Sequence, residues 1–180
     1  MAAPSDAASG SATPSTATGT STPKEHDRIA NFRTELASRG GEGEVRVLPD
    51  SVHTAQLAAD ALGCEVGAIA NSLLFVDAQG EPVLLLTSGA HRVNTDAVPA
   101  RMGLEGKLKR ASAAQVKRFA GQVIGGVSPI AHPAPIRTWI DGWLRKYPVL
   151  WAAAGHPAAV YSTSFDELQR MTGAVEIDVE

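Results

Sequence analysis

The stretch IANSLLFVDAQGEPVLLLT, residues 69–87, decides the fold. It holds two apolar runs of strand length, residues 69–76 and 82–87. The residues between them, Asp77 to Glu81, are types that favour turns, because Asp bonds to its own backbone and Gly accepts a positive φ. The stretch therefore predicts a β-hairpin.

On the N-terminal side of this hairpin, the sequence predicts two helices and a short strand. Apolar residues three and four positions apart indicate an amphipathic helix over residues 25–38. Alternating polarity over residues 44–48 is typical of a strand. Thr54 can cap the second helix and Gly63 can end it, because these residue types suit the two helix termini.

On the C-terminal side, helices are predicted over residues 113–120 and 165–172, each after a Ser with Gln or Glu three positions later. The predicted strands cover residues 136–141, 149–153, 159–162 and 175–179. Strands that follow one another outnumber strand-helix-strand units. We therefore expect an α/β (α+β) fold with a mixed, largely antiparallel sheet surrounded by helices, and a doubly wound parallel sheet is the less favoured alternative.

The composition divides the chain into a tail and one domain. Residues 1–24 are almost wholly Ala, Ser, Thr, Pro and Gly, and such a segment cannot bury enough apolar surface to offset its ordering entropy. We expect a disordered tail over 1–24 and a single compact domain over 25–180. The tail lacks the apolar core and basic start of a secretory signal. No apolar run reaches membrane-spanning length, so we expect no membrane partner.

Charge and cysteine content limit the function classes. The net charge of -3 gives no field that would attract a polyanion, so a nucleic-acid partner would need a local basic patch. A single cysteine, Cys64, excludes internal disulfides and fits a reducing cytoplasm. The five histidines show none of the spacings that build zinc sites, so no metal is expected.

The segment QVIGGVSPI, residues 122–130, is the strongest candidate for chemistry. Two adjacent glycines allow successive N–H groups to converge on one oxygen, which holds an oxyanion without a charged side chain. The N–H groups concerned are those of Gly125, Gly126, Val127 and Ser128. The alternative is a plain glycine turn before a proline.

Ser128 itself does not fit a nucleophile. A nucleophile elbow needs a glycine two residues after the serine and uses the N–H of the next residue. Here Ile130 and Pro129 occupy those positions, and proline has no N–H. Ser128 is better placed as a hydrogen-bonding wall residue of a pocket.

One local excess of positive charge lies across a strand and the helix after it. Its members are Lys107, Lys109, Arg110, Lys117 and Arg118. They could bind the phosphates of a tRNA acceptor stem. A solvated helix face explains the same residues equally well.

Taken in order, several segments resemble the YbaK/EbsC family and the related editing domain attached to prolyl-tRNA synthetases. The resemblance covers about residues 45–175. It rests on His53-Thr54, Ile69 to Phe75, Ser88 to Val93, Gly125 to Pro129, Ile140-Asp141, Gly155-His156-Pro157 and Met171 to Ala174. No single piece is diagnostic, but the order of all of them is specific.

The resemblance implies a free-standing deacylase that hydrolyses mischarged aminoacyl-tRNA, without a metal or another cofactor. The glycine segment would hold the substrate carbonyl, and a ribose hydroxyl of the terminal adenosine would help to activate water. The implied partner is mischarged tRNA, and the resemblance also allows an aminoacyl-tRNA synthetase as a partner. DNA is not an implied partner. The residues expected to bind the aminoacyl group are Asn71, His156, Thr54 and Pro129.

One departure from the family pattern affects the expected activity. Many members carry a functionally important lysine where this chain has Asn71, which keeps a donor and an acceptor but loses the charge. Asn71 could position a different amino acid or water. Alternatively, the domain is a non-catalytic module that binds aminoacyl-tRNA or a small molecule. An unrelated small-molecule-binding α/β protein is the third hypothesis.

Overall fold

The predicted hairpin forms the centre of the sheet. A computed structural model describes residues 25–180, so the predicted tail over 1–24 lies outside the described residues. Strands β2 (Ile69–Val76) and β3 (Pro82–Ser88) are antiparallel, with Ala70 opposite Ser88. Asp77 closes the turn because its Oδ1 accepts the N–H groups of Gln79 and Glu81 at 3.0 and 2.9 Å.

The sheet has eight strands in the order β1-β7-β6-β2-β3-β5-β8, with β4 paired to the edge of β2. The other strands are β1 (Val45–Val47), β4 (Lys109–Arg110), β5 (Arg137–Asp141), β6 (Leu150–Ala153), β7 (Ala159–Thr163) and β8 (Val175–Ile177). The pairs β2·β6, β3·β5 and β5·β8 are parallel, and the remaining pairs are antiparallel. The expected mixed sheet is confirmed.

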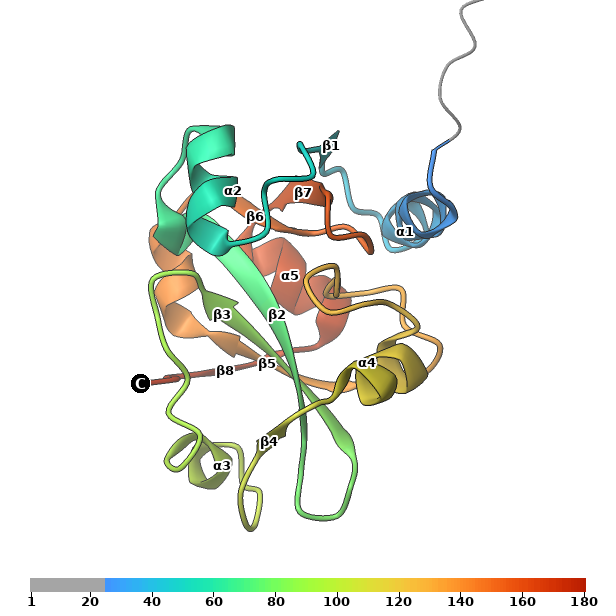
Figure 1. The fold of residues 1–180 in the computed structure, drawn as a ribbon. Helices are drawn as coiled ribbons and strands as arrows, with labels where there is room; N and C mark the ends of the chain where they lie inside the picture. The colour runs from blue at the N-terminus through green and yellow to red at the C-terminus, as the bar shows by residue number, and fades with distance from the viewer. Residues whose placement is uncertain (1–24) are drawn as a thin grey trace, which may run out of the picture.

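On the side away from β3, strand β2 is paired only at its two ends. Strand β6 pairs only with Ile69 and Ala70, at the start of β2. Strand β4 pairs only with Phe75 and Val76, at its end. Figure 1 shows β6 and β4 beside opposite ends of β2. The middle of β2 therefore faces a gap in the sheet.

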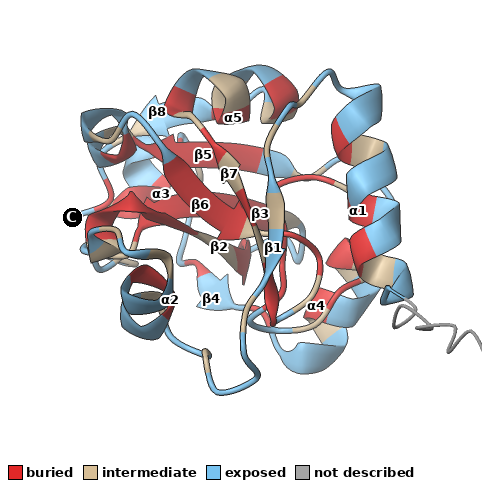
Figure 2. Cartoon of the chain, turned by 90° about the horizontal axis from the view of Figure 1, so that it is seen from above, coloured by how far each residue is buried: buried red, intermediate tan, exposed pale blue. Residues whose placement is uncertain are grey.

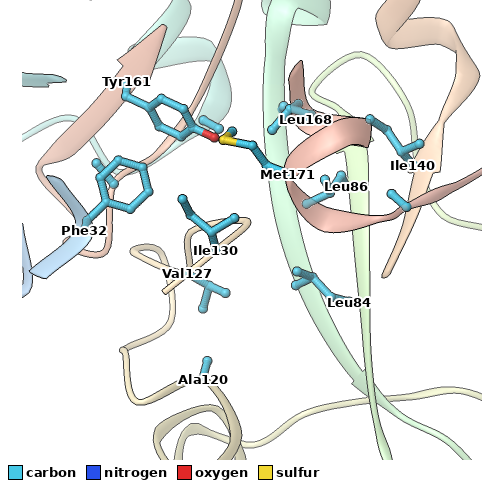
Figure 3. Close-up of a cluster of buried hydrophobic side chains, with 14 of the residues drawn as sticks. Phe32, Leu84, Leu86, Ala120, Val127, Ile130, Ile140, Tyr161, Leu168 and Met171 are labelled. Carbon is cyan, nitrogen blue, oxygen red and sulfur yellow. The ribbon is translucent and has the colours of Figure 1, made fainter. Parts of the chain in front are cut away.

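Helices cover both faces of the sheet. They are α1 (Asp27–Ser38), α2 (Ala55–Leu62), α3 (Val98–Arg101), α4 (Ala113–Ala120) and α5 (Phe165–Thr172), with 3-10 turns η1 (Val66–Ala68) and η2 (Gly142–Lys146). Leu84 and Leu86 point into the larger core with residues of α1 and α5 (Figure 3), whereas Val83 and Leu85 point into a second cluster that includes Val98 of α3. The central strands are accordingly buried, as Figure 2 shows.

Helices were predicted at the correct residues where the sequence contains clear N-capping residues. Residues 113–120 and 165–172 are helical, and Ser112 and Gln115 form the reciprocal capping box. At α5 only the Ser164 half forms, because the Glu167 carboxylate accepts the Thr163 hydroxyl instead. Helix α3 was not predicted, since four residues are too few to show a period.

Within residues 25–180, no helix has both the length and the apolar character needed to cross a membrane.

Candidate functional site

A cavity of about 420 Å³ lies at the gap beside β2. Its wall comes from five places in the chain: the start of α2, the middle of β2, the β4–α4 segment, the glycine segment, and β6 with β7. Among the cavity-lining residues there is no Asp or Glu. The wall is thus mainly apolar with a few polar groups, which is the usual character of a small-molecule site.

Two residues of the glycine segment line this cavity and have main-chain N–H groups without a partner among the described residues. Residues 123–126 form a turn in which the Gly126 N–H donates to the Val123 carbonyl at 3.0 Å. Gly125 is the third residue of that turn and has a φ of 86°, which is the type II geometry that requires glycine. Gly125 and Val127 line the cavity, and their N–H groups donate to none of the residues from 25 to 180.

The other two predicted donors are not available. The Gly126 N–H is used in the turn, and the Ser128 N–H donates to Gln122 Oε1 at 2.8 Å. Neither residue lines the cavity, and Ser128 is fully buried. The prediction of four converging amides is therefore wrong for Gly126 and Ser128, because each N–H carries one hydrogen and that hydrogen is already bonded.

Gly126 has a packing role instead. A Cβ at this position would lie 2.6 Å from Pro157 N and 2.7 Å from His156 C, and both of these are main-chain atoms. Only glycine allows this close approach between two loops. We expect any larger residue at 126 to move the loops apart, rather than to change the chemistry alone.

Two side chains that sequence reasoning missed hold the glycine segment. Gln122 is 4% exposed, and its Nε2 donates to Ser128 Oγ at 2.8 Å while its Oε1 accepts the Ser128 N–H. His132 Nε2 lies 2.8 Å from the Ser128 carbonyl oxygen. Burial lowers the pKa of His132, which favours the neutral ring. The contact then requires the tautomer with the proton on Nε2.

Asn71 and Thr54 line the cavity, as the sequence predicted. The Asn71 side chain makes no hydrogen bond with any residue that the structure describes. Thr54 Oγ1 accepts the Leu57 N–H at 3.1 Å and so caps α2. Ser72 also lines the cavity, and its buried Oγ has no hydrogen-bond partner among the described residues. Because successive side chains of a strand alternate, Asn71 and Ser72 lie on opposite faces of the sheet.

His156 and Pro129 were expected in the aminoacyl pocket and are not among the lining residues. The His156 ring packs 4.6 Å from the His26 ring, and its Nδ1 accepts the Ala158 N–H. Burial, with a contribution from His26, lowers the pKa of His156. Pro129 is buried in the loop. The neighbouring Pro157 lines the cavity, and His53 is the imidazole that does so.

The basic residues lie on the segment that forms one side of the cavity. Arg110 lines it, and its guanidinium lies 5.3 Å from the Phe75 ring centroid. Partial burial lowers the pKa of Arg110, but a guanidinium stays charged at any physiological pH. Lys107 pairs with Asp96 at 3.2 Å, whereas the Lys117 ammonium donates weakly to the Gly121 carbonyl. Lys109, Lys117 and Arg118 are exposed.

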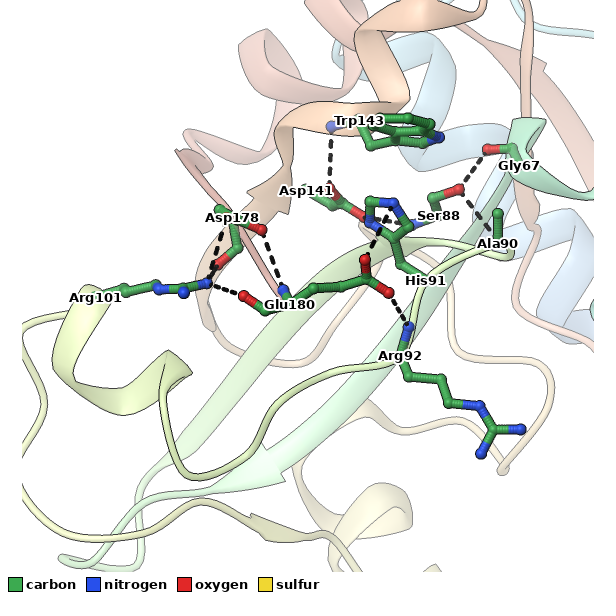
Figure 4. Close-up of polar contacts among 10 residues, drawn as sticks. All are labelled: Gly67, Ser88, Ala90, His91, Arg92, Arg101, Asp141, Trp143, Asp178 and Glu180. Atoms are coloured by element: carbon green, nitrogen blue, oxygen red, sulfur yellow. Dashed lines mark hydrogen bonds and ion pairs between the residues drawn. The ribbon is translucent and has the colours of Figure 1, made fainter.

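A second polar cluster, around Asp141, combines a serine, a histidine and an aspartate but has a structural role (Figure 4). Asp141 is 1% exposed, and its carboxylate lies 2.9 Å from His91 Nδ1 and accepts the N–H groups of Ser88 and Trp143. The Ser88 hydroxyl is fully buried and donates to the Gly67 carbonyl. No nucleophile is therefore exposed here.

Among residues 25–180, no group of three or more His, Cys, Asp or Glu side chains has an arrangement that could hold a metal ion.

Comparison with known proteins places this architecture in a family. The model of the aminoacyl-tRNA editing domain matches residues 49–171, a range that includes Asn71 and the whole glycine segment. The chain belongs to the aminoacyl-tRNA editing domain family. The resemblance predicted from the sequence is confirmed.

Solved structures support the assignment of this editing domain. A candidate trans-editing enzyme for prolyl-tRNA synthetase shares 36% sequence identity with a TM-score of 0.81, over 87% of this chain and 99% of that one. A scaffold protein used for epitope backbone grafting by computational design shares 35% identity with a TM-score of 0.79, over 85% and 97%. The uncharacterized protein YwhH of Bacillus subtilis (strain 168) is 24% identical over 152 residues, which cover 84% of the editing domain's chain and 96% of YwhH.

Proposed function

We propose that this editing domain is a deacylase that acts in trans and hydrolyses the ester bond of mischarged aminoacyl-tRNA. The observation that carries the proposal is the pair of unbonded N–H groups, those of Gly125 and Val127, at a cavity without carboxylates. Two preorganised main-chain donors suit the oxygen of an ester carbonyl, on which negative charge grows during hydrolysis. The proposed polarisation of the carbonyl does not require a nucleophilic side chain.

The proposed reaction needs few protein groups. Water adds to the ester carbonyl carbon, and the carbonyl oxygen becomes an oxyanion that accepts from Gly125 and Val127. The bond between the carbonyl carbon and the ribose oxygen then breaks, and the proton that the water has lost is transferred to that oxygen, which gives the free amino acid and uncharged tRNA. A neighbouring ribose hydroxyl of the terminal adenosine assists the water. Because the ester is already activated, positioning and carbonyl polarisation supply the acceleration.

The remaining cavity residues are proposed to select and orient the substrate. Asn71 offers an amide donor and acceptor to the cavity, which Thr54 at the start of α2 also lines. Arg110 and the exposed basic residues near it are proposed to bind phosphates of the tRNA. An aminoacyl-tRNA synthetase is a further proposed partner. A synthetase discriminates poorly between similar amino acids, because one methylene group changes the free energy of binding in its pocket by only about 1–3 kcal/mol. A second, small pocket in an editing domain adds the missing discrimination.

The direct test is a deacylation screen of the purified protein against tRNAs charged with cysteine, alanine, serine, threonine and proline. We expect at least one of them to be hydrolysed faster than its spontaneous rate. Absence of any acceleration would overturn the deacylase proposal. It would favour the alternative of a module that binds aminoacyl-tRNA without hydrolysing it.

A matched pair of substitutions tests the main-chain donors. Val127→Pro removes the N–H, whereas Val127→Ala keeps the N–H and removes two methyl groups of the buried side chain. If this N–H polarises the carbonyl, kcat should fall about 100-fold or more for Val127→Pro relative to Val127→Ala. Circular dichroism and thermal melts establish that both variants are folded. Equal kcat values in folded variants would contradict the role of Val127.

Asn71→Lys separates catalysis from binding. If Asn71 serves a working deacylase, the added charge should alter substrate choice or lower turnover in the same screen. If the wild-type protein is inert and Asn71→Lys hydrolyses a charged tRNA, the binding hypothesis holds for the natural chain. Asn71→Gln is the control, because it adds length without charge.

A further inference from the structure

The middle of strand β2 carries main-chain groups without partners at the cavity. Pairing with β6 ends at Ala70, and pairing with β4 begins at Phe75. Between these points Ser72, Leu73 and Leu74 all line the cavity. An open strand edge normally attracts another peptide group.

The direction of these groups follows from two hydrogen bonds. The Ile69 carbonyl accepts the Gly89 N–H at 2.8 Å, on the β3 side. The Leu74 carbonyl accepts the Ala111 N–H at 3.0 Å, on the opposite side. In an antiparallel ladder, the N–H and C=O of one residue point to the same side, and the side alternates along the strand. Both groups of Ser72 therefore point away from β3 and into the gap.

The Ser72 N–H and C=O bond to nothing else in the described part of the chain. Opposite Leu86 of β3, Ser72 occupies a non-hydrogen-bonded position, and neither β6 nor β4 reaches it. No other hydrogen bond involves its main chain. The buried Ser72 hydroxyl is also without a partner. Three unsatisfied polar groups at one residue of a cavity wall are explained if a bound ligand supplies their hydrogen-bond partners.

We infer that the Ser72 main chain binds the amino acid part of the substrate as a one-residue β-strand. The α-ammonium group of the aminoacyl ester donates to the Ser72 carbonyl, and the ester carbonyl accepts from the Ser72 N–H. This is the pair of bonds that two opposite residues exchange in an antiparallel ladder. The same oxygen gains a third lone pair when it becomes an oxyanion, so it can then also accept from the N–H groups of Gly125 and Val127. The inference rests on the proposed function, because it assumes an aminoacyl group in this cavity.

The wall offers no negative charge, which makes the Ser72 carbonyl important for the ammonium group. The lining has no carboxylate, so the ammonium must be recognised by neutral acceptors. Hydrogen bonds to a charged group are stronger than those between neutral groups. The site should therefore select acyl groups that carry an α-amino group over acyl groups that lack one, whatever the side chain is.

The test uses two probes that resist hydrolysis: 3′-amino-3′-deoxyadenosine with alanine in amide linkage, and the same nucleoside with a propionyl group. They differ only in the α-amino group. We expect the alanyl probe to bind about tenfold or more tightly by calorimetry, because only this probe can donate a charge-assisted hydrogen bond to the Ser72 carbonyl. In ¹H–¹⁵N spectra, the Ser72 amide signal should shift strongly with the alanyl probe.

Ser72→Ala is the matched variant, because it removes the hydroxyl and keeps both main-chain groups. It should keep the preference for the alanyl probe. Equal affinity of the two probes, or an unmoved Ser72 amide signal, would overturn the inference. Its failure is distinct from failure of the deacylase proposal. If the protein hydrolyses charged tRNA but binds both probes equally, only the Ser72 role is rejected. If it prefers the alanyl probe but hydrolyses no charged tRNA, only the deacylase proposal is rejected.

Discussion

At the scale of single residues, Gln122 determines how the glycine segment presents its donors. Its amide bonds to both the N–H and the hydroxyl of Ser128. His132 adds a contact to the Ser128 carbonyl, so every polar group of Ser128 is engaged. With Ser128 fixed, the two residues that line the cavity, Gly125 and Val127, have little freedom to move. We regard Gln122 as a positioning residue, since it does not itself line the cavity.

Replacing Gln122 with Leu tests this role. The change leaves the buried Ser128 N–H without an acceptor, which should lower the free energy of unfolding by about 1–3 kcal/mol. Deacylation should fall about tenfold or more at temperatures where the variant is folded, because the donors lose their alignment. Urea denaturation and single-turnover hydrolysis measure the two effects.

Gln169→Leu is the control for that substitution. Gln169 donates to the Ala174 carbonyl from α5 and does not line the cavity. Its loss should affect stability alone. If Gln122→Leu hydrolysed charged tRNA as fast as Gln169→Leu, the positioning role would be rejected.

At the scale of elements, the β4–α4 segment combines cavity wall and positive charge. Ala111 and Val116 face the cavity, while Lys109, Lys117 and Arg118 of the same segment are exposed. The reciprocal cap at Ser112 sets the direction in which α4 leaves the strand. A nucleic acid that follows this segment would bring its end to the cavity. The proposed tRNA surface is thus continuous with the proposed site.

Changing Lys109, Lys117 and Arg118 together to Gln should weaken tRNA binding and reduce its dependence on salt. For each phosphate that the variant no longer neutralises, the slope of log K against log salt should become shallower by about 0.7–0.9. Binding measured at several salt concentrations gives this slope. Lys146→Gln, at an exposed lysine of η2, should leave the slope unchanged. A triple variant with the wild-type slope would show that these residues are only a solvated helix face.

At the scale of the whole molecule, the sequence predicted those helices and strands whose ends are marked by local residue patterns. Thr54, Ser112 and Gly63 marked helix ends through caps, and the turn after Val76 marked the hairpin. The site depended on contacts that no local pattern contains. Gly126 packs against His156 and Pro157, which lie far along the chain, and this contact cannot be read from a pair of glycines.

The same reasoning explains the site residues that were assigned incorrectly. A glycine-rich segment indicates that main-chain groups can converge, but it does not say which of them are already bonded. Only the fold brings Gln122 to Ser128 and directs His156 to His26 instead of the cavity. In contrast, Asn71 and Thr54 do line the cavity, and their positions could be anticipated because the central strand and the cap of α2 were both clear in the sequence. That they bind an aminoacyl group stays a prediction.

Acid should destabilise the whole molecule through His132 and His156, whose pKa values burial lowers. The unfolded chain then binds more protons than the folded one. The stabilisation is complete above the ordinary histidine pKa of about 6.5 and is lost as the pH falls through the lower folded values. Urea midpoints at pH 7.5, 6.5 and 5.5 should therefore decrease in that order. His132→Gln should flatten this dependence, and an unchanged dependence would exclude His132 as a source.

The order of strands in the sheet has a consequence for the synthesis of the protein. The cavity lies beside β2, yet β6 and β7, which complete its wall, come from the last third of the chain. Domains fold as units, and a nascent chain grows from its N-terminus. A ribosome-bound chain that stops before β7 would lack part of the wall, although it already contains Asn71 and the glycine segment. The proposed ability to inspect tRNA would therefore arise only after β7 has been synthesised.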